Sequence, residues 1–160
     1  MKKEIYLKLD ELSIKYKVLE HEEVFTADEF YEVTKDMPGY HCKNLFLKNS
    51  NKSVNYLLVA KHDKAVDLKK VRSQIGSTRL SFDSAENLYE VLKVTPGSVN
   101  PFSIINDLDS KVEMLIDSEL LDGQNLNFHP AINTETFNIS GEDFSKFLNH
   151  IENNVTKIDI

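Results

Sequence analysis

The sequence predicts an α+β fold in a single domain, with a mixed, largely antiparallel β-sheet covered by helices. Three observations lead to this prediction. A chain of 160 residues suits one domain built around one core. Stretches with helical and with strand periodicity alternate irregularly, which disfavours a doubly wound parallel sheet. Two strand patterns are separated by only a short polar turn, which indicates a hairpin.

The composition is that of an ordinary globular domain, because 41% hydrophobic and 28% charged residues exclude a disordered chain. The basic first segment lacks the apolar run of a signal peptide, and no later segment is apolar enough to span a bilayer. We therefore expect a cytoplasmic protein with no membrane partner. The single cysteine, Cys42, cannot form an internal disulfide, and no histidine or cysteine cluster has metal-ligand spacing. Neither a metal nor a cofactor is expected.

Five helices are expected from apolar residues at helical spacing and from residues that cap helix ends. The capping signals are Thr26 with Glu29, Asp67 with Gly76 as the stop, the pattern Asp83 to Glu86, and Ser140. The residues that mark apolar faces are Ile5, Leu9, Leu12 and Tyr16 in the first helix, Phe30 and Val33 in the second, Leu88, Val91 and Leu92 in the fourth, and Phe144, Phe147, Leu148 and Ile151 in the last. The third helix is the short sequence "LKKVRSQI" after Asp67.

Strands are expected between these helices, where β-branched and aromatic residues alternate with polar ones. The expected strands are 16–21, a hairpin of 42–49 and 54–60, 79–82, 111–117, and one or two within 126–139. No internal repeat, low-complexity tract or linker interrupts them.

The loop "VTPGSVNPF" at 94–102 is unusually restricted. Pro96, Gly97 and Pro101 limit the backbone at three nearby points, so main-chain groups are presented in a fixed geometry. Such a loop is either a tight connection between two elements or one wall of a small-molecule pocket.

Lys43 is unusual because strand parity places it on the same face as Leu45 and Leu47. A lysine that faces inward is costly unless it has a task. The alternative is that the strand begins at Asn44 and the lysine reaches water. Cys42 has the opposite parity, which favours a buried, inert cysteine over a nucleophile.

His129 lies in the sequence "FHPAINT", where Pro130 restricts the backbone and Asn133 and Thr134 add short polar side chains. This pattern is typical of a pocket-lining loop, although a hydrogen-bonded structural histidine has the same pattern. Motifs for a serine nucleophile, a phosphate-binding glycine loop or paired zinc ligands are absent.

Positive charge is concentrated in one window of an acidic chain. The formal net charge is −7, but residues 61–79 hold six cations against two aspartates, which leaves +4 there and −11 elsewhere. The six cations are Lys61, Lys64, Lys69, Lys70, Arg72 and Arg79. They form either a solvated helix face or a local site for phosphate groups.

Three separated pieces follow one order along the chain: the strand "CKNLFL", the loop "PGSVNPF" and the late "FHPAINT". In this combination the sequence resembles the YbaK-like superfamily, which is related to the editing insertion domain of bacterial prolyl-tRNA synthetase. Within it, the sequence is most similar to the freestanding prolyl-tRNA editing proteins that remove mischarged alanine. The resemblance runs from about Phe25 to Leu148, so it covers nearly all of the single domain expected over 1–160.

The resemblance implies an editing-domain fold in which a lysine and a G-x-x-x-P loop meet at a pocket. Lys43 matches the functional lysine, and we expect it to be catalytic. The expected substrate-binding residues are Gly97, Ser98, Val99, Asn100, Pro101, His129, Asn133 and Thr134, and the six cations of 61–79 are expected to bind tRNA. Related loops often carry serine or threonine where this chain has Asn100.

The implied activity is hydrolysis of the ester in alanyl-tRNA(Pro). An aminoacyl ester is already activated, so positioned water and stabilised charge suffice without a protein nucleophile. The resemblance implies that a tRNA ribose hydroxyl assists the water. The expected partner is the acceptor end of tRNA(Pro) carrying alanine, and prolyl-tRNA synthetase is a candidate for delivering it. The alternatives are a cysteinyl-tRNA(Pro) deacylase and a catalytically silent module that binds an amino acid or tRNA.

Overall fold

One eight-stranded mixed sheet organises the computed structural model, which covers residues 1–160. The strands are β1 (Tyr16–Glu20), β2 (Tyr40–Lys48), β3 (Asn55–Lys61), β4 (Ser81–Phe82), β5 (Val112–Asp117), β6 (Leu126–Phe128), β7 (Glu135–Ile139) and β8 (Val155–Ile158). Their order is β1-β7-β6-β2-β3-β5-β8, and β4 pairs with β2 outside this row. Four pairings are antiparallel and three are parallel. The predicted α+β fold with a mixed sheet is confirmed.

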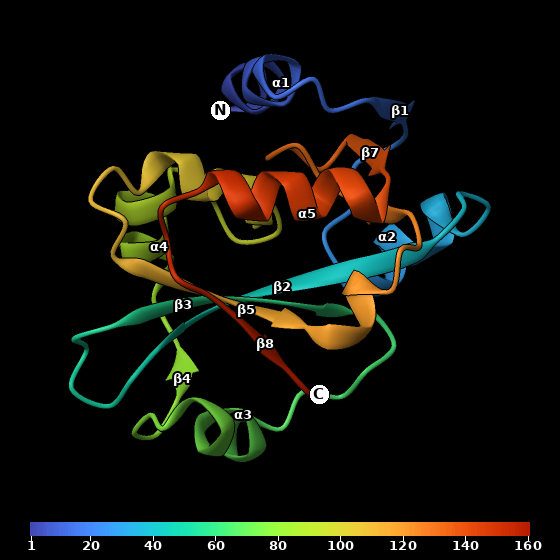
Figure 1. Ribbon diagram of the computed structural model, residues 1–160. Helices are drawn as coiled ribbons and strands as arrows, with labels where there is room; N and C mark the ends of the chain where they lie inside the picture. The colour runs from blue at the N-terminus through green and yellow to red at the C-terminus, as the bar shows by residue number, and fades with distance from the viewer.

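Helices cover both faces of this sheet. They are α1 (Lys2–Glu11), α2 (Ala27–Thr34), α3 (Leu68–Ile75), α4 (Ala85–Leu92) and α5 (Gly141–His150), with 3₁₀-helices η1 (Pro101–Asn106) and η2 (Ser118–Leu121). Figure 1 shows α1, α4 and α5 on one side of the sheet and α3 on the other. None of the helices combines the length and the apolar character needed to cross a membrane.

The helix starts follow from their capping residues. Thr26 accepts the backbone N–H of Glu29 at 3.1 Å and completes a capping box. Asp67 accepts the N–H of Lys69 at 2.9 Å. At α4 the capping residue is Ser84, which accepts from Asn87, rather than the preceding aspartate of the expected pattern.

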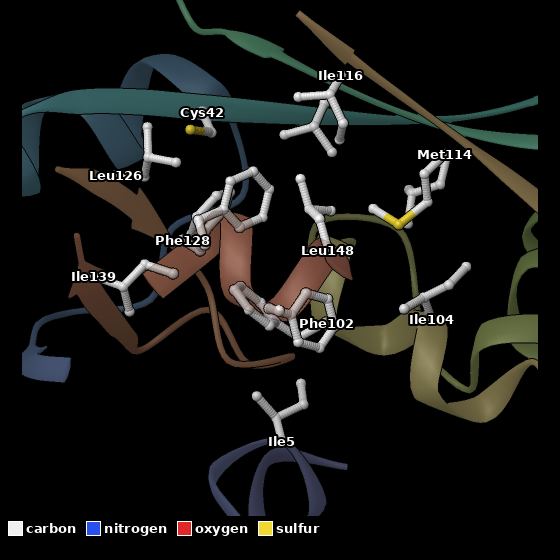
Figure 2. Packing of buried hydrophobic residues seen from close by; sticks show 14 of the residues in the cluster. Ile5, Cys42, Phe102, Ile104, Met114, Ile116, Leu126, Phe128, Ile139 and Leu148 are labelled. Carbon is white, nitrogen blue, oxygen red and sulfur yellow. The ribbon is translucent and has the colours of Figure 1, made fainter. Parts of the chain in front are cut away.

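Two hydrophobic cores flank the sheet. The larger one joins α1, α4 and α5 to the sheet and contains a group of phenylalanines, namely Phe102, Phe128, Phe137, Phe144 and Phe147. Figure 2 shows Phe102 and Phe128 in this core, with Cys42 directed into it from β2. The smaller core lies under α3 and includes Val71, Leu80, Leu115 and Ile158. Burial of each such side chain contributes about 1.5–3 kcal/mol, so both faces of the sheet are fixed by packing.

The strands after β3 match the expectations in part. The segment 126–139 contains two strands, β6 and β7, separated by a turn. Only Ser81–Phe82 of the expected strand 79–82 pairs with the sheet. The end of the restricted loop continues into η1, and the sequence did not predict β8, which pairs in parallel with β5.

The sheet has a gap beside the middle of β2. On that side, β6 pairs with Tyr40 and His41, and β4 pairs with Leu47 and Lys48. Residues 42–46 between them pair only with β3 on the other side. The strand therefore has an open edge inside the fold, where side chains from both faces of the sheet can meet.

Candidate functional site

A pocket of about 220 Å³ lies at the open edge of β2. Four segments of the chain line it: the entry and first turn of α2, the middle of β2, the loop after α4, and the loop after β6. The lining residues are Val24, Phe25, Thr26, Ala27, Phe30, Cys42, Lys43, Asn44, Leu45, Gly97, Val99 and His129. Lys43, Gly97 and His129, far apart in sequence, line the same pocket.

The edge position explains why neighbours on β2 both line this pocket. Lys43 and Asn44 point to opposite faces of the sheet, because successive side chains of a strand alternate. In a continuous sheet a paired neighbour strand would separate the two side chains, so they could not line the same pocket. Here the missing neighbour strand exposes the edge, so the pocket is bounded from both faces.

Lys43 is half-buried, and its ammonium group donates a hydrogen bond to the backbone carbonyl of Lys64. A lysine has three N–H donors, so two remain for a ligand. The Lys64 side chain is itself held by Asp117 at 2.9 Å and by Glu119 at 2.7 Å. The turn after β3 therefore fixes the direction of the Lys43 side chain.

The restricted loop is held rigidly beside the pocket. Gly97 has φ +89°, a conformation that favours glycine. Asn100 is fully buried, and its side chain accepts the N–H of Ser103 at 3.0 Å and donates to the carbonyl of Ser98 at 3.1 Å. Of the five expected loop residues, Gly97 and Val99 line the pocket, whereas Ser98, Asn100 and Pro101 do not.

Asn44 is a pocket residue that sequence reasoning missed. Its amide donates to the carbonyl of Val99 at 3.1 Å, which links β2 to the restricted loop. Its side-chain oxygen is buried and has no hydrogen-bond partner in the protein. Such an unpaired acceptor beside a pocket is a natural partner for a ligand donor. The sequence does contain one signal for Asn44. It is a polar residue on the side of the strand that Cys42 and Phe46 direct into the core.

His129 packs its ring against Phe30, with the ring centroids 4.1 Å apart. Burial lowers the pKa of His129 to about 4, so the imidazole is neutral at pH 7. Its Nδ1 lies 3.4 Å from the carbonyl oxygen of Glu135, a contact that favours the tautomer with the proton on Nδ1. In that tautomer Nε2 is a hydrogen-bond acceptor.

Asn133 and Thr134 support this wall of the site without lining the pocket. The carbonyl of Asn133 accepts the N–H of Val24 at 3.1 Å, and that of Thr134 accepts the N–H of His21 at 2.9 Å. These bonds attach the segment before α2 to the loop that carries His129. Their expected role as substrate-binding side chains has no geometric support.

Cys42 has the properties of a core residue. Its side chain is 4% exposed, and Figure 2 shows its sulfur turned into the core near Leu126 and Phe128. Burial raises the pKa of the thiol well above its usual range, which disfavours the thiolate. This residue is unsuited to act as a nucleophile.

The six cations of 61–79 separate into two groups. Lys61 lies 3.2 Å from Glu119, and Lys64 binds the buried Asp117, so both are in ion pairs within the fold. By contrast, side chains of α3 and the segment after it border a shallow hollow of about 710 Å³. The cations there are Lys69, Arg72 and Arg79, and Lys70 is exposed on the same helix.

Comparison with known proteins identifies the family. Residues 21–147 match the model of the aminoacyl-tRNA editing domain. The chain belongs to this family. It is 37% identical over 159 residues to prolyl-tRNA editing protein ProX of Acetoanaerobium sticklandii, covering 99% of this chain and 97% of that protein. It is 36% identical to prolyl-tRNA synthetase associated domain-containing protein 1 of mouse, over 92% of this chain and 89% of that one.

Solved structures show the same fold. A protein described as a candidate trans-editing enzyme for prolyl-tRNA synthetase superposes with a TM-score of 0.72 at 16% identity, covering 99% of this chain and 96% of that one. The hypothetical protein APE2540 superposes with a TM-score of 0.74 at 14% identity, over 98% of both chains. Membership of the editing-domain family implies an aminoacyl-tRNA deacylase.

Proposed function

We propose that this protein is a trans-editing hydrolase that cleaves the ester of alanyl-tRNA(Pro) and releases alanine and free tRNA. The observation that carries the proposal is the small pocket at the open edge of β2, where Lys43, Gly97 and His129 meet. The names of its relatives, which refer to prolyl-tRNA editing and to prolyl-tRNA synthetase, support the tRNA(Pro) assignment.

In the proposed reaction, water attacks the ester carbonyl, the bond between the acyl carbon and the ribose oxygen breaks, and that oxygen leaves with a proton. The free N–H donors of Lys43 stabilise the charge that develops on the carbonyl oxygen or hold the terminal phosphate. No covalent intermediate with the protein forms, which is consistent with the burial of Cys42.

The amino group of the bound alanine has two candidate acceptors. One is the unpaired side-chain oxygen of Asn44, and the other is Nε2 of neutral His129. An α-ammonium group bound between them would direct the ester toward Lys43. These contacts would orient the substrate, and orientation lowers the barrier without a further catalytic group.

Selection by size follows from the same walls. Gly97 and Val99 belong to a loop that buried Asn100 holds in place, so the pocket cannot easily widen for a larger ring. A rigid small pocket admits alanine and rejects proline by steric clash. The exposed cations on and after α3 would bind tRNA phosphates, and a synthetase could deliver the charged tRNA.

The test is a deacylation assay with alanyl-tRNA(Pro) and cysteinyl-tRNA(Pro). We expect the alanyl ester to be cleaved faster than the cysteinyl ester. Lys43→Ala should lower the rate by about 100-fold, as loss of one charge-stabilising donor typically does. Lys48→Ala on the same strand is the matched control, because Lys48 lies outside the pocket.

Two results would contradict this proposal. Faster cleavage of cysteinyl-tRNA(Pro) would assign the pocket to cysteine. Tight binding of alanyl-tRNA(Pro) without cleavage would identify a silent binding module.

A further inference from the structure

A second and larger pocket, of about 450 Å³, is lined by other residues of the same helix and strand, α2 and β2. It lies between α2 and the neighbouring ends of β2 and β3, and Figure 1 shows α2 beside the start of β2. Its walls include Tyr31, Lys35, Tyr40, His41, Lys61 and His62. None of these is among the residues proposed to contact the aminoacyl group.

Aromatic rings dominate one wall of this second pocket. Tyr31 and His62 are parallel to within 4°, with centroids 5.4 Å apart, and His41 meets Tyr31 edge-on at 5.2 Å. Tyr31 remains 42% exposed although it belongs to this packed group. A large aromatic side chain held in place yet open to a pocket is suited to stacking against a planar ligand.

The charges around this pocket disfavour a simple anion site. Lys61 is paired with Glu119 and Asp63, and its ammonium lies 4.7 Å above the Tyr40 ring. Lys35 is paired with Glu32 at 2.9 Å. A free phosphate would meet these carboxylates as well as the lysines. A neutral planar ring with polar edges fits this environment better.

His62 gives the pocket a group that can form a hydrogen bond with the polar edge of such a ligand. Its Nδ1 is buried without a hydrogen-bond partner in the protein, and its Nε2 lies 3.8 Å from Asp28. An unpaired nitrogen next to a stacked ring gives the pocket capacity for a hydrogen bond as well as for stacking.

The two pockets have no lining residue in common, but residues that are neighbours in the chain line them. Phe30 lines the first and Tyr31 the second, while Cys42 lines the first and His41 the second. Along β2, positions 41 and 43 are only about 7 Å apart. A ligand that spans both pockets would combine a small group near Lys43 with a planar ring near Tyr31. An aminoacyl nucleoside has this composition, because a ribose joins the acyl group to the base.

We propose that the second pocket binds the terminal nucleoside of the tRNA acceptor strand, with its base stacked on Tyr31. This inference rests on the proposed function, because it assigns the nucleoside attached to the ester that the first pocket would hold. Stacking of a base on an aromatic side chain stabilises binding and tolerates any base. The pocket would thus position the ester without reading sequence.

The test measures the affinity of uncharged RNA, by fluorescence anisotropy, and requires no catalysis. One probe is an acceptor-stem hairpin that ends in CCA, and the other is the same hairpin without its last nucleoside. We expect the parental protein to bind the complete hairpin at least about 5-fold more tightly, the equivalent of about 1 kcal/mol. Tyr31→Ala should abolish this difference, whereas Tyr31→Phe should keep it.

Tyr89→Ala is the matched control, because Tyr89 is an exposed tyrosine that lines neither pocket. It should behave like the parent. Thermal unfolding verifies that each variant is folded, and Tyr31→Phe keeps the test decisive if Tyr31→Ala does not fold. A parent that binds both hairpins equally would overturn the proposal, as would a Tyr31→Ala variant that keeps the difference or a Tyr31→Phe variant that loses it.

The deacylation assay separates this inference from the proposed function. If the parent cleaves alanyl-tRNA(Pro) but binds both hairpins equally, only the nucleoside site is wrong. If the parent distinguishes the hairpins but cleaves no alanyl-tRNA(Pro), the nucleoside site stands and the proposed reaction is wrong.

Discussion

At the scale of single residues, burial determines the protonation of His129. Its pKa is about 4 in the folded protein and about 6.5 in an unfolded chain. Below pH 6.5 the unfolded chain therefore binds a proton that the folded protein does not. Folding is destabilised as the pH falls from 6.5 toward 4, by an amount on the order of 3 kcal/mol over the full range.

This linkage predicts a difference between the parent and His129→Gln. Both proteins lose stability in acid because other groups titrate, but the parent should lose about 2 kcal/mol more between pH 6.5 and 4.5. Urea unfolding at several pH values measures this difference. Equal losses would show that His129 titrates at its ordinary pKa.

Gly97 and Gly123 allow a matched test of the restricted loop. They have φ values of +89° and +95°, and a Cβ added to either would meet no atom within 4 Å. Alanine at either position should therefore cost about 1 kcal/mol in backbone strain. Only Gly97 lines the pocket, so only Gly97→Ala should also slow deacylation of alanyl-tRNA(Pro).

Thermal unfolding of the two glycine variants measures the backbone strain, and their deacylation rates measure the effect of the altered pocket shape. We expect similar melting temperatures and at least about a tenfold lower rate for Gly97→Ala alone. If both variants kept the parental rate, the loop would be a connection rather than a pocket wall.

Some pocket residues were predictable from the sequence and others were not. Lys43 and His129 stand out because an inward lysine and a histidine before proline are locally unusual. Asn44 has only a weak signal, a polar residue at a core-facing position of its strand, and Phe25 has none, since an apolar residue before a helix is common. Their importance depends on the missing neighbour strand, and no local pattern in the sequence contains that information.

At the scale of elements, the cations of 61–79 are predicted to have two different roles. Lys64 neutralises Asp117, which is fully buried and otherwise accepts only two backbone N–H groups. Lys64→Met should therefore lower the free energy of unfolding by about 2 kcal/mol. The triple change Lys69→Gln, Arg72→Gln and Arg79→Gln should leave stability within about 0.5 kcal/mol.

The triple variant should instead bind tRNA more weakly, and the slope of log affinity against log salt should fall by about 2. Denaturant unfolding and tRNA titrations at several salt concentrations test both halves of this prediction. Unchanged tRNA affinity in the triple variant would show that these cations form a solvated helix face and do not bind tRNA. Unchanged stability in Lys64→Met would mean that Asp117 needs no cation.

The helices were more predictable than the strands, for physical reasons. Capping residues such as Thr26 and Ser140 form bonds with neighbours three residues away, so their signal is local. By contrast, β8 is a four-residue strand that is largely exposed and depends on parallel pairing with β5. Its partner is distant in the chain, and its own residues carry no clear alternation.

At the scale of the whole molecule, the sheet topology creates the site. The open edge exists because β6 and β4 pair with opposite ends of β2 and leave its middle free. Two cores hold the strand from both faces, so the edge cannot close by a shift of register. The pocket between these supports is small, which is the physical basis of the proposed selection by size.

The most direct test of this account compares alanyl-tRNA(Pro) and prolyl-tRNA(Pro) as substrates on the same tRNA. Both esters share the acceptor end, so every RNA contact is constant and only the fit of the amino acid differs. The account predicts that kcat/KM is at least about 100-fold higher for the alanyl ester. Equal values for the two esters would contradict the claim that the pocket at the open edge of β2 selects its substrate by size.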